Sequence, residues 1–181
     1  MNGTHPSHNY RLFVPKQAVG ANLVYFDLFN AAGSGRKLSI SSIQPVISGA
    51  VAVTVTLGVD LFLTYTTTVG TGGTAATFRG TDTTACTITP VNPAIGALAS
   101  GISARLTPTG GATAGPVLVM ASVFTEETAA AAYLGRQVDF INIGSHPEDI
   151  IIPEGFGIRI VQGAVASAGN IAFNVLFGYD E

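Results

Sequence analysis

The sequence predicts an all-β protein, an antiparallel β-sandwich with one short connecting helix near residues 125–134. Short runs of apolar residues alternate with polar ones at period two, the pattern of strands that bury one face. Turns rich in glycine, proline and threonine separate these runs. Parallel sheets need a crossover, usually a helix, between strands, and the chain offers a single helical stretch, so we expect antiparallel pairing.

The expected strands are short and follow one another closely. In chain order they cover residues 10–14, 22–30, 36–43, 51–64, 86–90, 102–107, 117–124, 138–143, 149–152, 158–161 and 170–179. In the third strand the alternation changes phase between Ile40 and Ile43, which predicts a β-bulge or a corner between sheets. The fourth alternates for too long to fit the domain, so it should bend or break near Gly58. Proline at Pro90 and Pro93 predicts that residues 86–90 form an edge strand.

Two other stretches have distinctive patterns. Residues 117–124 are apolar on both faces and are expected to lie centrally in a sheet. The helix expected at 125–134 has a Thr125 N-cap, two acids in its first turn and a closing Gly135.

The last part of the chain predicts a β-hairpin over residues 153–179. Alternating apolar residues in two runs should together close one face of the core, namely Ile158 and Ile160 in the first run and Ile171, Phe173, Val175 and Phe177 in the second. Arg159 and Asn174 fall on the opposite phase and are expected to point outward.

One domain is expected over residues 10–181, preceded by a polar, flexible N-terminal arm at 1–9. Among β-sandwich folds, a jelly roll is favoured. An immunoglobulin domain would need a Cys…Trp…Cys pattern, and the chain has no tryptophan and a single cysteine, Cys86, which is expected to be a small packed hydrophobe.

Charge is scarce in this sequence. Charged residues make up 10% of the chain and the net charge is −3, whereas a typical domain has about 25% charged residues. A neutral surface is poorly solvated for a free monomer, so we expect much of it to face other subunits. The basic residues are scattered and no apolar run approaches the ~18–20 residues of a bilayer span, so neither nucleic acid nor a membrane is expected as a partner.

Catalytic patterns are not found, and no enzyme activity, cofactor or metal is expected. The glycine-rich stretch at 69–74 lacks a Gly-Lys-Ser/Thr motif and a following helix, which argues against a phosphate-binding loop. The histidines, His5, His8 and His146, lack the spacing of a cupin-type metal site. No Gly-x-Ser-x-Gly nucleophile motif occurs.

Three segments resemble small jelly-roll structural proteins of tailed-phage virions, the decoration, cement or head-fibre kind. They are Phe26-Asp27-Leu28-Phe29-Asn30 leading through Gly33-Ser34-Gly35 to Arg36-Lys37-Leu38-Ser39-Ile40, the middle stretch with Gly72-Gly73-Thr74, and Ile151 to Ile160 with the closing strand. The resemblance spans most of residues 22–181 and leaves out the arm. It implies a virion protein, assembled in the host cytoplasm, that self-associates as a trimer and docks on the major capsid protein or other virion proteins.

The expected interface residues follow from these assignments. Contacts with other virion proteins are expected through residues 1–14 or the loop at 66–82, which points to Tyr10, Arg11, Phe78 and Arg79, and through Arg159 and Asn174. Two alternatives stay open: a ligand- or glycan-binding β-sandwich that uses Tyr65 or Phe78, and a metal-dependent jelly-roll enzyme that uses His146.

Overall fold

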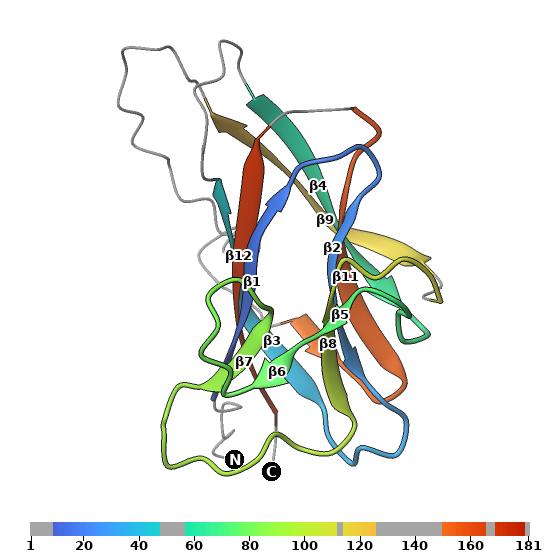
Figure 1. Cartoon of the computed structure of the whole chain (residues 1–181). Coiled ribbons are helices and arrows are strands. Elements are labelled where there is room, and N and C mark those ends of the chain that lie inside the picture. Colours follow the sequence, from blue (N-terminus) through green and yellow to red (C-terminus); the bar gives the residue numbers. More distant parts are fainter. Residues whose placement is uncertain (1–8, 48–56, 112–113, 126–149, 166–168, 180–181) are drawn as a thin grey trace, which may run out of the picture.

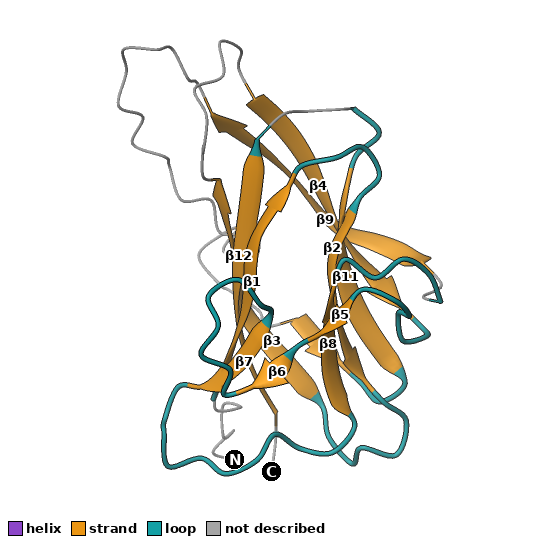
Figure 2. Cartoon of the chain, in the orientation of Figure 1, coloured by secondary structure: helices purple, strands orange, loops and turns teal. Residues whose placement is uncertain are grey.

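The protein is described from a computed structural model, which defines residues 9–47, 57–111, 114–125, 150–165 and 169–179. In these residues the chain is all β, with two six-stranded sheets packed as a sandwich (Figure 1). Every strand pair is antiparallel except β6 with β7. Strands joined by loops make up the described part, in which no helix occurs (Figure 2). It therefore holds no helical segment of the length and apolarity that a bilayer crossing requires.

Strands that follow one another along the chain usually belong to different sheets. Sheet A has the order β10-β3-β12-β1-β7-β6 and sheet B the order β5-β8-β2-β11-β4-β9. The strands of sheet A are β1 (Tyr10–Ala18), β3 (Leu38–Ile47), β6 (Thr77–Phe78), β7 (Thr87–Pro90), β10 (Ile150–Ile152) and β12 (Asn170–Tyr179). Those of sheet B are β2 (Val24–Asn30), β4 (Leu57–Thr66), β5 (Thr74–Ala75), β8 (Ile102–Leu106), β9 (Ala114–Thr125) and β11 (Phe156–Gln162).

The core lies between the sheets and is built from the apolar phase of the alternating strands. Phe173 of β12 stands at its centre, with its ring 5.3 Å from that of Tyr25 and 5.6 Å from that of Phe26 on the facing sheet. All three side chains are fully buried. The expectation that alternation marks the buried face is confirmed for Ile158, Ile160, Ile171, Phe173, Val175 and Phe177, all buried.

The hairpin expected over residues 153–179 is wrong, although both of its strands exist. β11 pairs with β2 and β4 in sheet B, whereas β12 pairs with β1 and β3 in sheet A. The connection after β11 therefore crosses from one sheet to the other. Two consecutive strands with apolar faces can bury those faces against each other across the core as well as side by side, and alternation alone does not distinguish the two arrangements.

Strand β9 contradicts the expectation for residues 117–124. These residues do form a strand, but among the described residues it is the edge strand of sheet B and pairs with β4 alone. Its outward side chains are open to solvent, with Val117 56% and Met120 52% exposed. The apolar residues on both faces are the signal that predicts a central strand, and in this protein that signal occurs at an edge.

The bulge expected between Ile40 and Ile43 is confirmed. Ser42 pairs with Leu176 and Ile40 with Phe177, so Ser41 is an extra residue in β3. A second shift, between Ile160 and Val161 of β11, leaves Tyr25 as an extra residue in β2. That bulge allows Tyr25 and Phe26, adjacent in sequence, both to reach the core.

One end of the core is closed by a polar contact around Tyr25. Its hydroxyl donates to Oε1 of Gln162, and the backbone N–H of Gly20 donates to the same oxygen at 2.8 Å. The Gln162 amide nitrogen in turn donates to the carbonyl of Val165 at 3.1 Å. Burial raises the pKa of Tyr25 to about 12.

The stretch between β4 and β9 adds strands to both sheets. β7 and β6 extend sheet A beyond β1, and β8 and β5 extend sheet B beyond β2. The prediction that residues 86–90 form an edge strand is wrong by one place, because the two-residue β6 lies outside β7. Cys86 is fully buried as expected, and burial raises the pKa of its thiol to about 12.

Several expectations fall on residues that the structure does not describe. The helix near 125–134 lies outside the described residues apart from Thr125, which is the last residue of β9. The strand expected at 138–143, the start of the long run at 51–64 and residues 1–8 of the arm also lie outside them. β4 begins at Leu57, next to the expected break at Gly58.

Candidate functional site

The outer face of sheet A is the surface that brings expected interface residues together. Arg11 of β1 lies opposite Leu176 of β12, and the next outward pair along the same strands is Phe13 with Asn174. Arg11 and Asn174 are therefore diagonal neighbours on adjacent strands. They were expected from different parts of the sequence, and antiparallel pairing of the first and last strands places them side by side.

The neighbouring strands extend this surface, which we call face A. The register β1–β7 and β12–β3 places on it Arg11, Phe13, Ser42, Gln44, Val46, Thr89, Ala172, Asn174 and Leu176. Their exposure ranges from open (Arg11, Thr89, Val46) through half-buried (Phe13, Leu176, Asn174) to the nearly buried Ala172.

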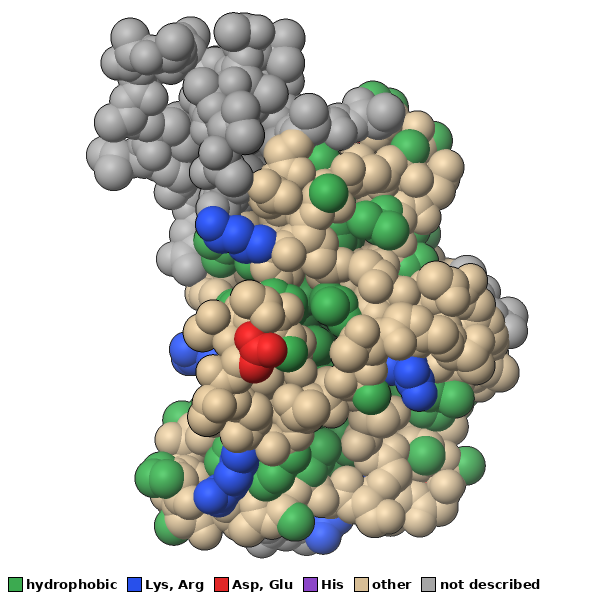
Figure 3. Space-filling model, in the orientation of Figure 1, with side chains coloured by type: hydrophobic (Ala, Val, Ile, Leu, Met, Phe, Trp, Pro, Cys, Tyr) green, Lys and Arg blue, Asp and Glu red, His purple; other side chains and the backbone are tan. Residues whose placement is uncertain are grey.

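Face A offers recognition chemistry and no reactive group. Arg11 is the one charged residue among these nine, and the others are hydroxyls, amides and apolar side chains. Lys16, in the bulge of β1, is a further exposed charge on the same strand. Such a mixture resembles a protein interface, in which apolar area is ringed by polar groups that form hydrogen bonds. In the view of Figure 3, too, charged side chains stand apart from one another on a surface that is otherwise neutral.

Tyr10 does not belong to this surface. Its side chain is 2% exposed, and its ring stacks on Phe177 at 5.6 Å and on Tyr179 at 5.2 Å. The Tyr10 and Tyr179 hydroxyl oxygens lie 2.6 Å apart in a buried hydrogen bond. The expectation of Tyr10 as an accessible contact residue is therefore wrong for the single chain, since it faces the core at the start of β1.

Phe78 and Arg79 lie together at the far edge of sheet A, and both are already engaged within the chain. The Phe78 ring is half-buried against Tyr10, with 6.5 Å between centroids. The Arg79 guanidinium lies over the Phe78 ring at 5.5 Å and donates to the carbonyls of Pro93, at 3.0 Å, and Ile95. Arg79 also has a left-handed backbone (φ 56°), which places it in a turn. Its exposed side chain holds the 91–99 loop in place.

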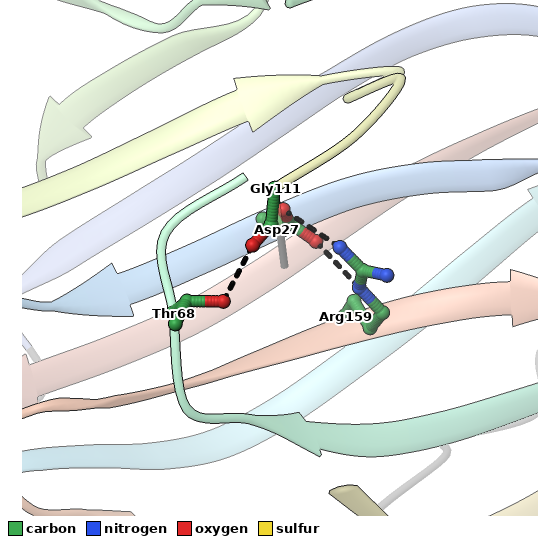
Figure 4. A network of polar contacts seen from close by, with 4 residues as sticks. All are labelled: Asp27, Thr68, Gly111 and Arg159. Carbon is green, nitrogen blue, oxygen red and sulfur yellow. Dashed lines mark hydrogen bonds and ion pairs between the residues drawn. The ribbon is translucent and has the colours of Figure 1, made fainter. Parts of the chain in front are cut away.

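Arg159 is not the outward contact that the sequence predicts. It lies on the phase opposite Ile158 and Ile160, as expected, yet the residue is 9% exposed. Its guanidinium donates from Nε to Oδ1 of Asp27 at 3.0 Å and from Nη2 to Oδ2 at 3.2 Å (Figure 4). The two residues are direct partners in the β2–β11 ladder, so the ion pair follows from strand register.

Loops of the β4–β9 stretch cover this ion pair. Gly70 approaches so closely that a Cβ added there would lie 2.0 Å from Oδ2 of Asp27 and 2.9 Å from Cβ of Pro108. Nearby, the Thr68 hydroxyl donates to the carbonyl of Gly111 at 2.6 Å and joins the two covering loops (Figure 4). Arg105 faces Asp27 from the other side, on β8, and donates to the carbonyl of Gly72 at 3.0 Å.

The electrostatics of Asp27 combine opposing effects. Burial raises the pKa of its carboxyl group, while the hydrogen bond from Arg159 and the positive charges of Arg159 and Arg105 act to lower it. The net direction is upward. Sequence reasoning did not single out Asp27, although a signal was present: it is the lone charge in the apolar run of β2, as Arg159 is in β11.

The residues of the alternative hypotheses are not brought together. Tyr65 of β4 donates its hydroxyl to the carbonyl of Ile151 in β10, whereas Phe78 lies in β6. β10 and β6 are the opposite ends of sheet A, so the two rings do not form one glycan platform. His5, His8 and His146 lie outside the described residues, and within those residues no three side chains of the His, Cys, Asp and Glu type gather as metal ligands.

Comparisons of the chain with protein-family models, with curated proteins and with solved structures find no match.

Proposed function

We propose that the protein is a non-enzymatic structural subunit of a virus particle, which self-associates through face A and decorates or cements a capsid or forms part of a neck or fibre. The observation that carries the proposal is face A itself: a sheet surface of mixed apolar and neutral polar residues on which charge is scarce. A surface with so few charged side chains is poorly solvated, which favours association with other subunits.

A jelly-roll fold is part of this proposal. β1 pairs with β12, β2 with β11, β3 with β10 and β4 with β9, so that the first strand meets the last and each following pair is nested inside the previous one. Such nested pairing is what one long hairpin gives when it is rolled into two sheets. It supports the jelly-roll assignment, with β5 to β8 as an insertion between the fourth and fifth strands of the roll, and viral capsid domains use this architecture.

Sedimentation velocity of the purified chain tests self-association. We expect a trimer, and we expect Asn174→Lys to dissociate it, because that variant places a second positive charge beside Arg11 in the middle of face A. Val165→Lys is the matched control, since Val165 is 70% exposed in the loop that follows β11. A wild-type chain that stays monomeric would contradict the proposal, as would an Asn174→Lys variant that associates as the wild type does.

Mass spectrometry of purified virus particles tests whether the protein is a component of the particle. We expect the protein to be a particle component, with hundreds of copies if it decorates the lattice and about a dozen if it occupies a vertex or neck, because closed symmetry fixes copy number. A protein missing from purified particles would remove the virion assignment and leave self-association as a separate finding.

A further inference from the structure

The four strands that end the two sheets differ sharply in length. β10 has three residues, β6 two and β5 two, whereas β9 has twelve. Very short strands are a usual protection of a sheet edge, because an edge exposes backbone N–H and C=O groups that can pair with another chain. Three ends of this sandwich are protected in that way, and β9 is not.

The sequence of β9 lacks other edge protection over most of its length. Ala114–Thr125 contains no Asp, Glu, Lys or Arg, and its one proline is Pro116. The β4–β9 register is regular from the pair Leu57 and Thr125 to the pair Leu63 and Val119, and the register shifts lie beyond it, toward Ala114. Bulges and proline therefore protect the first half of β9, and the second half is a regular strand that can accept a partner.

The side chains on this half are also suited to contact. Val119, Ala121 and Val123 lie opposite the core residues Leu63, Leu61 and Val59 and extend the apolar interior to the edge. On the outer face Met120 is 52% exposed. Beside it Ser122 donates to Oδ1 of Asp60 at 2.5 Å, so the carboxylate nearest the edge is held on the neighbouring strand β4.

We propose that the β9 edge pairs antiparallel with β9 of a second copy of this chain, across a two-fold axis at Ala121. Within the described ranges nothing pairs with the outer edge of β9. The register would set Val119 of one copy opposite Val123 of the other, and Met120 opposite Ser122. The two B sheets would become one continuous sheet.

Charge selects a second copy over other occupants. In this two-fold register only Ala121 meets its own copy, but a charge at position 120 or 122 would lie diagonally across from the like charge of the other copy, and the strand carries no charge. A charged partner strand would find no complement on β9. A helical partner would leave the edge backbone groups of β9 without hydrogen bonds.

This inference goes beyond the function proposed above and does not use face A. With both contacts present, trimers formed through face A would pair through β9 into an assembly larger than a trimer. The two can be separated with one variant on each surface. Loss of association in Asn174→Lys alone would support face A and overturn the β9 contact, and loss in Met120→Lys alone would do the reverse.

Sedimentation velocity of the full chain, with Met120→Lys, tests the contact. The lysines at position 120 of the two copies would be diagonal neighbours beside the two-fold axis, so we expect their repulsion to lower the association constant by about tenfold or more. The matched control is Val91→Lys, at a residue 58% exposed in the loop after β7, which should associate as the wild type does. Equal association of Met120→Lys and wild type would overturn the proposal.

A Met120→Cys variant treated with a short bismaleimide gives an independent measurement. We expect a covalent dimer at concentrations at which the wild type associates, and none from the wild type, whose Cys86 is buried. A Met120→Cys thiol that resists maleimide, together with a Met120→Lys variant that loses stability but keeps its mass, would mean that another segment of the same chain covers β9. That result, or a wild type that stays monomeric up to submillimolar concentration, overturns the proposal.

Discussion

Asp27 and Arg159 form a two-pronged ion pair on adjacent strands of sheet B, with donor and acceptor atoms 3.0 and 3.2 Å apart beneath the loop that contains Gly70. A charge on the outside of a sandwich normally faces water. In this protein the loops between β4 and β5 and between β8 and β9 cover it, so the pair behaves as a buried one. This changes what is expected of variants at Arg159, which the sequence alone placed at the surface.

Asp27→Asn is expected to lower the free energy of unfolding by about 3–5 kcal/mol, because it leaves the buried guanidinium of Arg159 without its counter-charge. Arg159→Ala should cost a similar amount for the converse reason. Urea denaturation followed by circular dichroism measures both. Lys37→Ala is the control, since it removes an exposed charge just before β3, away from face A, and should change stability by no more than about 0.5 kcal/mol. A loss below about 1 kcal/mol for Asp27→Asn would mean that the pair is solvated in solution.

Gly70→Ala is expected to destabilise the protein by roughly 1–3 kcal/mol, since the added methyl group would overlap both Asp27 and Pro108. Gly96→Ala is the matched control: a Cβ there meets no atom within 4 Å, so the change should be neutral or slightly stabilising. Thermal unfolding compares the two, with a shift of about 2–4 °C in Tm for each kcal/mol in a chain of this size. Equal Tm values for the two variants would show that the loop does not rest on the ion pair.

Alkaline conditions are expected to weaken the fold through Tyr25. Its pKa is about 12 in the folded protein against 10.0 for the free side chain, so the unfolded chain releases the proton first. The contribution to stability is complete below pH 10 and is lost as the pH rises toward 12, by about 1.4 kcal/mol per pH unit. Unfolding free energies measured from neutral to alkaline pH should fall less steeply in Tyr25→Phe. The Cys86 thiol, shifted from 9.0 to about 12, contributes to the slope of both proteins. Identical slopes in the two proteins would contradict the expectation.

Local pattern was sufficient to predict most of the described strands and the buried phase within them, but not the two-residue strands β5 and β6, which fall in the expected loop at 66–82. Phe173, Val175 and Phe177 alternate as a one-sided strand must, and the phase slip after Ile40 marked a bulge that exists. These features depend on neighbours in sequence, and that is why they could be predicted.

Strand partners could not be predicted in the same way. The apolar residues of β9 fit an edge that pairs with another chain as well as they fit a central strand, and the alternation of β11 and β12 fits two facing sheets as well as a hairpin. The ion pair required three unknown facts: that β2 and β11 are neighbours, that Asp27 lies opposite Arg159, and that a glycine loop covers them. Each depends on contacts between segments far apart in the sequence.

The hydrogen bond between the hydroxyl groups of Tyr10 and Tyr179 has a consequence for how the chain folds. The two residues are 169 positions apart, and their strands β1 and β12 are neighbours in the interior of sheet A. β1 can pair with β7 once residue 90 has been made, but during synthesis it must wait for nearly all the rest of the described chain before its longer partner β12 exists. Closing so large a loop makes folding slow, and it exposes apolar strands until the last one has been made. Refolding from denaturant should accordingly be far slower than for a helical protein of the same length, with completion of sheet A as a late step.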